Sequence, residues 1–302
     1  MGMFDFMFSP KAGKGVERDE PKRHPFIQFW KLVWRKLSRL IAVNALYFIV
    51  ILPLIVLVYM FFNSALGLQP GQTIETDGEA ATLIMPGFLL VGLFSYIPEP
   101  VFYGLCVVSA VLFGPATCGF TYVLRNFARE EHAWISDFWS KAKANFTVGL
   151  KLGLIEVVAV ILIALSLSAG GAANTEELSG MTQLMFTASR YISVMVVALL
   201  LCIHYYLYTM AVTFEMKAFH ILKNSLIFAV VGMWRNLLTL AVFAVIAVLL
   251  FLSAGMLAGL LEIILLAMIF LSLGGFAAVF IQYPLIRKHM LDPQLEKENT
   301  DV

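Results

Sequence analysis

Two ionisable residues within otherwise apolar runs are the strongest candidates for chemistry. Glu156 lies in the run 148–169 and His204 in the run 191–213. At 1.5 Å per helical residue, Glu156 would lie about 12 Å into its helix, too deep for a short side chain to reach the lipid headgroups easily. Because an unpaired carboxylate in hydrocarbon is costly, we expect Glu156 to face inward and His204 to be its partner. Such a pair fits either a substrate or proton site or a hydrogen bond that fixes two helices.

A second group of candidate polar residues lies in the run 101–124. Gly114-Pro115 interrupts this run at its middle, and proline removes a backbone donor from a helix. We therefore expect a helix kink at Gly114 and Pro115, either purely structural or part of a broken helix that contacts a ligand. Thr117 and Thr121, one turn apart, would bind the freed carbonyls or line a polar seam.

Motifs for established enzyme chemistry are absent from the sequence. There is no GxxxxGK[ST] phosphate loop, no HExxH, no GxSxG and no cluster of Cys and His with metal-ligand spacing. Cys106, Cys118 and Cys202 all fall within apolar runs. One histidine and two carboxylates, Glu156 and Glu262, are too few to specify an active site. We expect no enzymatic activity, no cofactor, no metal ion and no nucleic-acid partner.

The elements that would position these side chains are membrane-spanning helices. Hydrophobic residues make up 60% of the chain, charged residues only 14%, and the mean hydropathy is +0.86. A hydrocarbon layer about 30 Å thick requires roughly 20 helical residues, and only helices or closed barrels satisfy the backbone there. The sequence predicts an all-α polytopic bundle with six spans, at 40–62, 101–124, 148–169, 191–213, 236–254 and 258–283.

The distribution of basic residues predicts the orientation of these spans. Of 21 Lys and Arg residues, all but Arg190 fall in four regions that six passes bring to one side: 11–39, 125–151, 217–235 and 287–297. By the positive-inside rule, these regions and both termini are cytoplasmic. No apolar core precedes Leu40, so we expect a retained first span rather than a cleaved signal peptide.

Aromatic residues mixed with charges predict cytoplasmic amphipathic helices that lie at the membrane interface. Such segments precede the first, third and fifth spans, around residues 26–36, 130–146 and 215–234. The order suggests three units, each an interfacial helix followed by two spans. Ordinary aromatic belts would explain the same residues without any duplication.

One apolar segment, 83–97, is too short to span a bilayer. It is fifteen residues long, contains Pro86-Gly87 near its start, and is followed by Pro98-Glu99-Pro100, whose prolines interrupt a helix. We expect a short interfacial or re-entrant helix on the outer face, reached through the acidic loop that carries Glu75, Asp77 and Glu79. A packed extension of the second span is the alternative.

Glycine spacing adds an expectation about helix packing. Gly149-x-x-x-Gly153 has the spacing with which small residues allow two helices to approach closely. We expect this contact within one chain rather than between two copies.

Several of these residues carry a family resemblance. The run Gly114-Pro115-Ala116-Thr117 continues into Tyr122-Val123-Leu124-Arg125 and Arg129-Glu130, then Asp137-Phe138-Trp139 and Asn145-Phe146, and a later stretch holds Ile221-Leu222-Lys223-Asn224-Ser225-Leu226 and Arg235-Asn236-Leu237-Leu238. Over residues 26–291 the chain resembles the YesL-like family of bacterial membrane proteins, whose biochemical activity is unassigned. Residues 63–100 are an insertion relative to typical members. The resemblance implies a role beside carbohydrate-uptake permeases and two-component regulators.

The sequence thus predicts one membrane domain, 26–291, between polar cytoplasmic tails 1–25 and 292–302. We expect a multi-pass protein of the bacterial cytoplasmic membrane, in contact with the lipid bilayer and in an oligomeric state that the sequence leaves open. The favoured function is an accessory or regulatory component linked to carbohydrate uptake, with a carbohydrate permease or sensor protein as partner. The alternative is a small-solute, sugar-related secondary transporter with a midplane site near the kinked second span.

Overall fold

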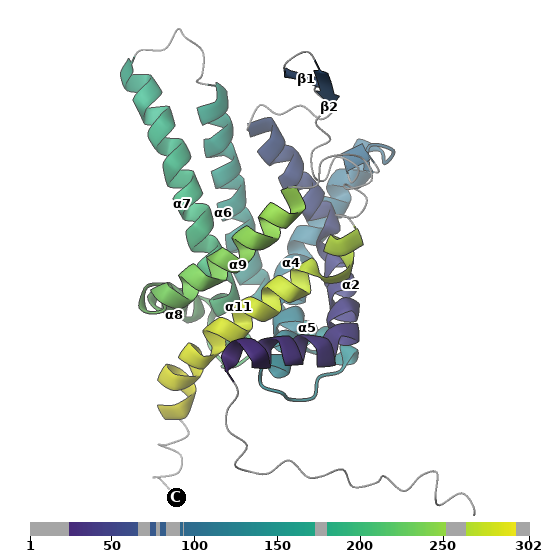
Figure 1. Cartoon of the computed structure of the whole chain (residues 1–302), viewed down its shortest axis with the longest axis vertical. Coiled ribbons are helices and arrows are strands. Elements are labelled where there is room, and N and C mark those ends of the chain that lie inside the picture. The colour runs from purple at the N-terminus through teal and green to yellow at the C-terminus, as the bar shows by residue number, and fades with distance from the viewer. Residues whose placement is uncertain are drawn as a thin grey trace, which may run out of the picture.

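A computed structural model describes residues 24–65, 73–76, 79–82, 91–92, 94–172, 180–251 and 264–293. Long helices dominate (Figure 1): α2 (Pro25–Ala65), α4 (Glu99–Ala128), α6 (Phe146–Ala172), α7 (Gly180–Ala211), α9 (Met233–Phe251) and α11 (Leu271–Ile286). Two shorter helices, α5 (Ile135–Ala144) and α8 (Ala218–Val231), precede α6 and α9. Two π-helical segments, η1 (Leu266–Phe270) and η2 (Arg287–Leu291), flank α11.

The expected helical membrane bundle is confirmed. Five helices are long and apolar enough to cross a membrane, and a sixth span results if the bent pair α8 and α9 is counted as one. The bend between these two helices is 90° and falls at Gly232. A Cβ on Gly232 would lie 2.8 Å from the backbone carbonyl oxygen of Phe228 and 2.5 Å from the Tyr206 hydroxyl oxygen, so a larger residue fits here only if its neighbours shift.

The order of elements follows the expected three units. The first turns of α2, α5 and α8 each precede two long helices, and the start of α2 lies across the lower end of the bundle in Figure 1. The first described residues of α2 and the last of η2 lie at this same end. The order of helices is compatible with three units of one short segment and two spans. Internal duplication of the sequence stays a prediction, and ordinary aromatic belts stay the alternative.

Two boundaries differ from the sequence prediction. The helix α7 begins at Gly180, so Arg190 lies inside a helix and not in a loop. Apolar residues continue at helical spacing before position 191, for example Leu184 and Met185, and the helix therefore extends beyond the predicted span. The interfacial segment and the first span are one helix, α2, rather than two.

The insertion between α2 and α4 contains a two-stranded antiparallel ribbon that the all-α prediction did not include. Strand β1 (Thr73–Thr76) pairs with β2 (Glu79–Thr82), with Thr76 opposite Glu79 and Thr73 opposite Thr82. The sequence between the strands is Asp77-Gly78, a dipeptide typical of two-residue hairpin turns. This short ribbon leaves the helical architecture unchanged.

The predicted short segment 83–97 is described only in part, since 83–90 and 93 lie outside the described residues. Its end forms a helical turn in which the Ser95 N–H donates to the Val91 carbonyl oxygen (2.9 Å). Val91, Phe94 and Ile97 pack against a small cluster that contains Val56 of α2 and Phe102 of α4. This turn ends before Pro98 and α4 begins at Glu99, so the described end of the segment is separate from the helix α4, and the interfacial or re-entrant helix stays a prediction.

The helices α4 and α6 cross very closely at three glycines. A Cβ on Gly114 would lie only 1.9 Å from the Gly149 carbonyl oxygen, and one on Gly153 would lie 2.7 Å from the backbone of Gly114. The expectation that Gly149-x-x-x-Gly153 packs within one chain is confirmed. Small residues on both helices make this approach possible.

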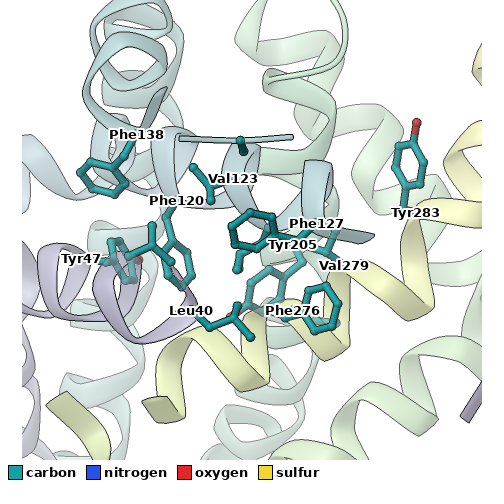
Figure 2. Close-up of a cluster of buried hydrophobic side chains, with 14 of the residues drawn as sticks. Leu40, Tyr47, Phe120, Val123, Phe127, Phe138, Tyr205, Phe276, Val279 and Tyr283 are labelled. Atoms are coloured by element: carbon teal, nitrogen blue, oxygen red, sulfur yellow. The ribbon is translucent and has the colours of Figure 1, made fainter. Parts of the chain in front are cut away.

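The largest buried cluster joins α2, α4, α7 and α11 (Figure 2). Tyr47 stacks on Phe120 with ring centroids 4.2 Å apart. Phe138 of α5 is fully buried in this cluster, although it belongs to the segment 130–146 that was expected to lie at the membrane interface. A Cβ on Gly119 would meet the Phe138 backbone, so α5 packs tightly on α4 rather than lying loosely at the interface.

Candidate functional site

The structure brings Glu156 and His204 together. The His204 Nδ1 lies 2.9 Å from Glu156 Oε1, joining α6 to α7, and only 7% of Glu156 is exposed. The prediction that these two residues pair and that Glu156 faces inward is therefore confirmed. A carboxylate at this depth is stabilised only when its oxygens are hydrogen-bonded, which is the arrangement observed.

Tyr208 completes the group and was missed as a partner of Glu156. Its hydroxyl donates to Glu156 Oε2 at 2.8 Å, so each carboxylate oxygen has its own partner. The spacing from His204 to Tyr208 is four residues, which places both side chains on one face of α7. That spacing was the signal available in the sequence. We refer to Glu156, His204 and Tyr208 as the carboxylate triad.

Aromatic rings surround the triad. The His204 ring centroid lies 4.7 Å from that of Tyr205 and 6.2 Å from that of Phe113, and Phe113 lies 6.5 Å from Tyr208. These rings exclude water from most of the site and strengthen its hydrogen bonds. The His204 side chain keeps 20% of its surface exposed, so it is the open edge of the triad.

Thr117 and Thr121 are both fully buried but differ in their contacts. The Thr117 hydroxyl donates to the Phe113 carbonyl oxygen (2.6 Å) and lies 2.8 Å from the Tyr47 hydroxyl. Thr117 thus binds the helix carbonyl one turn before it, which is not the carbonyl that Pro115 leaves free, that of Val111. The Thr121 hydroxyl has no hydrogen-bond partner among the described residues. Sequence reasoning did not single out Tyr47, because a tyrosine in an apolar span carries no distinctive pattern.

Gly114 and Pro115 lie inside one continuous helix, α4, and both are buried. The sequence left open a broken helix at this place, but the helix runs unbroken from Glu99 to Ala128. The observed role of Gly114 is the close crossing with α6. A kink at Gly114 and Pro115 stays a prediction.

Polar groups also tie the last helices to the bundle. Asn44 of α2, fully buried, donates from Nδ2 to the carbonyl oxygens of Leu266 (2.9 Å) and Ala267 (2.7 Å), and its Oδ1 accepts from the Ser272 N–H (2.7 Å). A π-helical turn disturbs the regular hydrogen-bond ladder, so these backbone groups need outside partners. Asn44 supplies them.

The charged residues of the motif region have structural roles at one end of the bundle. Arg125, only 7% exposed, donates to the Val212 carbonyl oxygen (2.8 Å) just beyond the end of α7. Asp137 accepts from the Trp134 N–H (2.8 Å) at the start of α5. Glu130 accepts from Arg35 (2.8 Å) and Gln28 (2.9 Å), and the Arg35 hydrogen bond lowers the pKa of Glu130 below its usual value.

Among the described residues, no group of three or more His, Cys, Asp or Glu side chains could hold a metal ion. Two cavities flank α8. The larger, about 1220 Å³, lies between α6 and the connection from α7 to α8, and the smaller, about 250 Å³, lies between α8 and η2. None of the three triad residues lines either cavity, although Ile155, the neighbour of Glu156 in the chain, lines the larger one.

Fold and site together define a multi-pass helical membrane protein whose intramembrane charge is paired internally. Residues 40–167 match the family described as "Protein of unknown function, DUF624". The matched range contains the close glycine crossing, Arg125, Glu130 and Glu156. No curated protein and no solved structure matches this chain.

Proposed function

We propose that this protein is a YesL-like accessory or regulatory component of a carbohydrate-uptake system. In this proposal it has no enzymatic activity and binds a permease or a sensor protein in the bacterial cytoplasmic membrane. The sequence resemblance over residues 26–291 supports the carbohydrate association, and the match of residues 40–167 to a family of unknown function is compatible with it.

An exposed aromatic stripe on α2 carries the proposal. Phe26, Trp30 and Trp34 follow one another at intervals of four residues, and Trp34 is 71% exposed. The adjacent face of the same turns is already used inside the chain, where Phe29 stacks on Phe276 (ring centroids 5.4 Å apart). One apolar face of this helix packs inside the chain, and the exposed aromatic face is available to contact a partner. Large aromatic residues are also the commonest anchors of protein interfaces.

The carboxylate triad supports the same proposal, because its hydrogen bonds suit a structural role. Both oxygens of Glu156 are bound by residues of the same chain. These two hydrogen bonds fix α6 against α7 and account for the burial of the Glu156 side chain without a bound solute. None of the three triad residues lines either of the two cavities beside α8.

The proposed orientation places the aromatic stripe on the cytoplasmic side. Apart from Arg190, every Lys and Arg of the sequence belongs to the regions that the positive-inside rule assigns to the cytoplasm. A partner's cytoplasmic helices or coupling segments would therefore meet Phe26, Trp30 and Trp34 at the inner membrane surface.

Site-specific photocrosslinking in native membranes tests the proposal. A photoreactive amino acid at position 34 should give a discrete adduct that mass spectrometry identifies as a carbohydrate permease or a sensor kinase. Trp234 at the start of α9 is 80% exposed and offers a matched control position. Equal adducts from positions 34 and 234, or lipid adducts alone from position 34, would contradict a specific partner surface.

A transporter is the second candidate, and one observation favours it. The buried hydroxyls of Thr121, Thr209 and Tyr206 have no hydrogen-bond partner among the described residues, as expected if water or a solute enters the bundle. Purified protein in liposomes would then move a sugar, and Glu156→Gln would reduce the flux. Solute movement by the purified protein alone would replace the accessory role by this one.

A further inference from the structure

The larger cavity combines positive charge with an apolar wall. It lies where the end of α5 and the first turns of α6 face the connection between α7 and α8. Its lining includes Lys141, Lys151 and Lys217, against a single carboxylate, Glu215. We call this cavity the lysine groove.

The three ammonium groups of the lysine groove are not neutralised within the described chain. No ion pair of Lys151 or Lys217 occurs among the described residues, and both side chains are exposed. Lys141 lies 4.9 Å above the ring of Tyr122, a contact that holds the ammonium in place without removing its charge. The groove therefore carries a net positive charge that is free to attract an anion.

The helix α8 adds to this charge. It begins at Ala218, directly after Lys217, and has no side-chain cap on its first N–H groups. Ala218 and Phe219 both line the groove. The partial positive charge of a helix N-terminus thus lies beside the lysines.

Apolar residues continue the groove away from its charged part. Lys151 is followed one turn later by Leu154 and Ile155, which also line the groove and are 43% and 45% exposed. One helical turn is about 5.4 Å, so the lining changes from basic to apolar within the length of a lipid headgroup. Phe219, 72% exposed, lies on the α8 side.

We propose that the lysine groove binds an anionic phospholipid, with the phosphate at Lys141, Lys151 and Lys217 and an acyl chain along Leu154 and Ile155. A soluble phosphate would use the basic part alone, whereas the apolar wall requires a molecule with both a phosphate and a hydrocarbon chain. Basic pockets between helices at a membrane surface are typical sites for such headgroups.

Lipid-dependent thermal stability of the purified full chain in neutral detergent tests the proposal. Phosphatidylglycerol should raise the melting temperature in a saturable manner, and phosphatidylcholine with the same acyl chains should not. The double variant Lys151→Gln with Lys217→Gln should bind phosphatidylglycerol on the order of 30-fold more weakly, since each lysine near an anionic lipid contributes about 1 kcal/mol. Its melting temperature without lipid should equal that of the unchanged protein.

A charge-matched control separates a site from general attraction. Lys143 and Lys223 are exposed on α5 and α8 but do not line the groove, and their double replacement by Gln should leave lipid binding unchanged. Equal weakening by both double variants, or an equal response to both lipids, would overturn the proposal. Stabilisation by inorganic phosphate at the same concentrations would assign the groove to a soluble anion and would overturn the proposal of a lipid site.

Discussion

Replacement of Gly114 by alanine tests the close crossing of α4 and α6. The added Cβ would lie 1.9 Å from the Gly149 carbonyl oxygen, about 1.5 Å short of ordinary van der Waals contact. The obstructing atoms belong to the backbone of Gly149 and Gly153, so no side-chain rotation relieves the overlap. The two helices must move apart, which typically costs about 1–3 kcal/mol of folding stability.

A second glycine of the same helix provides the control. Gly104 has no atom within 4 Å of its ideal Cβ position, so Gly104→Ala adds no clash. Alanine in a helix interior is favoured over glycine by about 1 kcal/mol. Both glycines lie in the interior of α4, so this gain is common to the two variants, and they should differ by the overpacking cost of about 1–3 kcal/mol, with Gly104→Ala at least as stable as the unchanged protein and Gly114→Ala less stable than Gly104→Ala.

The assay follows from the buried thiols. Cys106, Cys118 and Cys202 are all free and buried, so a thiol-reactive fluorogenic dye reports their exposure on heating in detergent. At about 2–4 °C per kcal/mol for a protein of this size, Gly114→Ala should melt several degrees below Gly104→Ala. Equal melting temperatures, or a higher one for Gly114→Ala, would refute the crossing.

Three further predictions concern the triad, an ion pair and the topology. Tyr208→Phe leaves one Glu156 oxygen unpaired and should lower stability by about 1–3 kcal/mol in the thiol assay, whereas Tyr191→Phe on the exposed face of α7 should have no effect. Because Arg35 lowers the pKa of Glu130, their pairing stabilises the protein at neutral pH, and this stabilisation is lost as the pH falls through the lowered pKa. The unchanged protein should therefore melt above Glu130→Gln at neutral pH, by a difference that reflects less than about 1 kcal/mol for this exposed pair. This difference should vanish in acid, and a difference that stays constant with pH would contradict the pairing. Reporter fusions should appear outside after positions 70, 175 and 256 and inside after 30, 135, 225 and 295, and an inside signal at 70 would contradict six spans.

The apolar runs and the basic residues predicted most of the fold, because a bilayer imposes length and charge rules on any spanning helix. The runs located every long helix of the described structure. Details that depend on neighbouring helices were less accessible. Phe138 follows the same aromatic pattern as the exposed Trp139, and only the space beside Gly119 decides that it is buried.

The sequence predicted the part of the candidate site whose burial costs the most free energy, the carboxylate of Glu156. Glu156 needs a partner in hydrocarbon, and His204 was the one ionisable residue at a similar depth in the next span. Tyr208 and Tyr47 were not predicted as partners, since tyrosines are common in membrane helices and their hydroxyls gain meaning only from the opposite helix. The π-helical turn at η1 was not predicted either, because Asn44, which binds its backbone groups, lies more than 200 residues earlier in the chain.

The contacts of Asn44 have a consequence for the order of biogenesis. Its carbonyl partner Leu266 is 222 residues further along the chain, and at about 5–20 residues per second the ribosome needs roughly 10–45 s to reach it. During this interval the amide of the first span has no permanent partner, although an unpaired amide is costly in lipid. The nascent chain therefore needs a temporary polar neighbour, such as water or an insertion factor, until η1 arrives. Chains truncated before residue 264 lack the Leu266 and Ala267 carbonyl groups, so the Asn44 amide of such chains keeps no permanent partner.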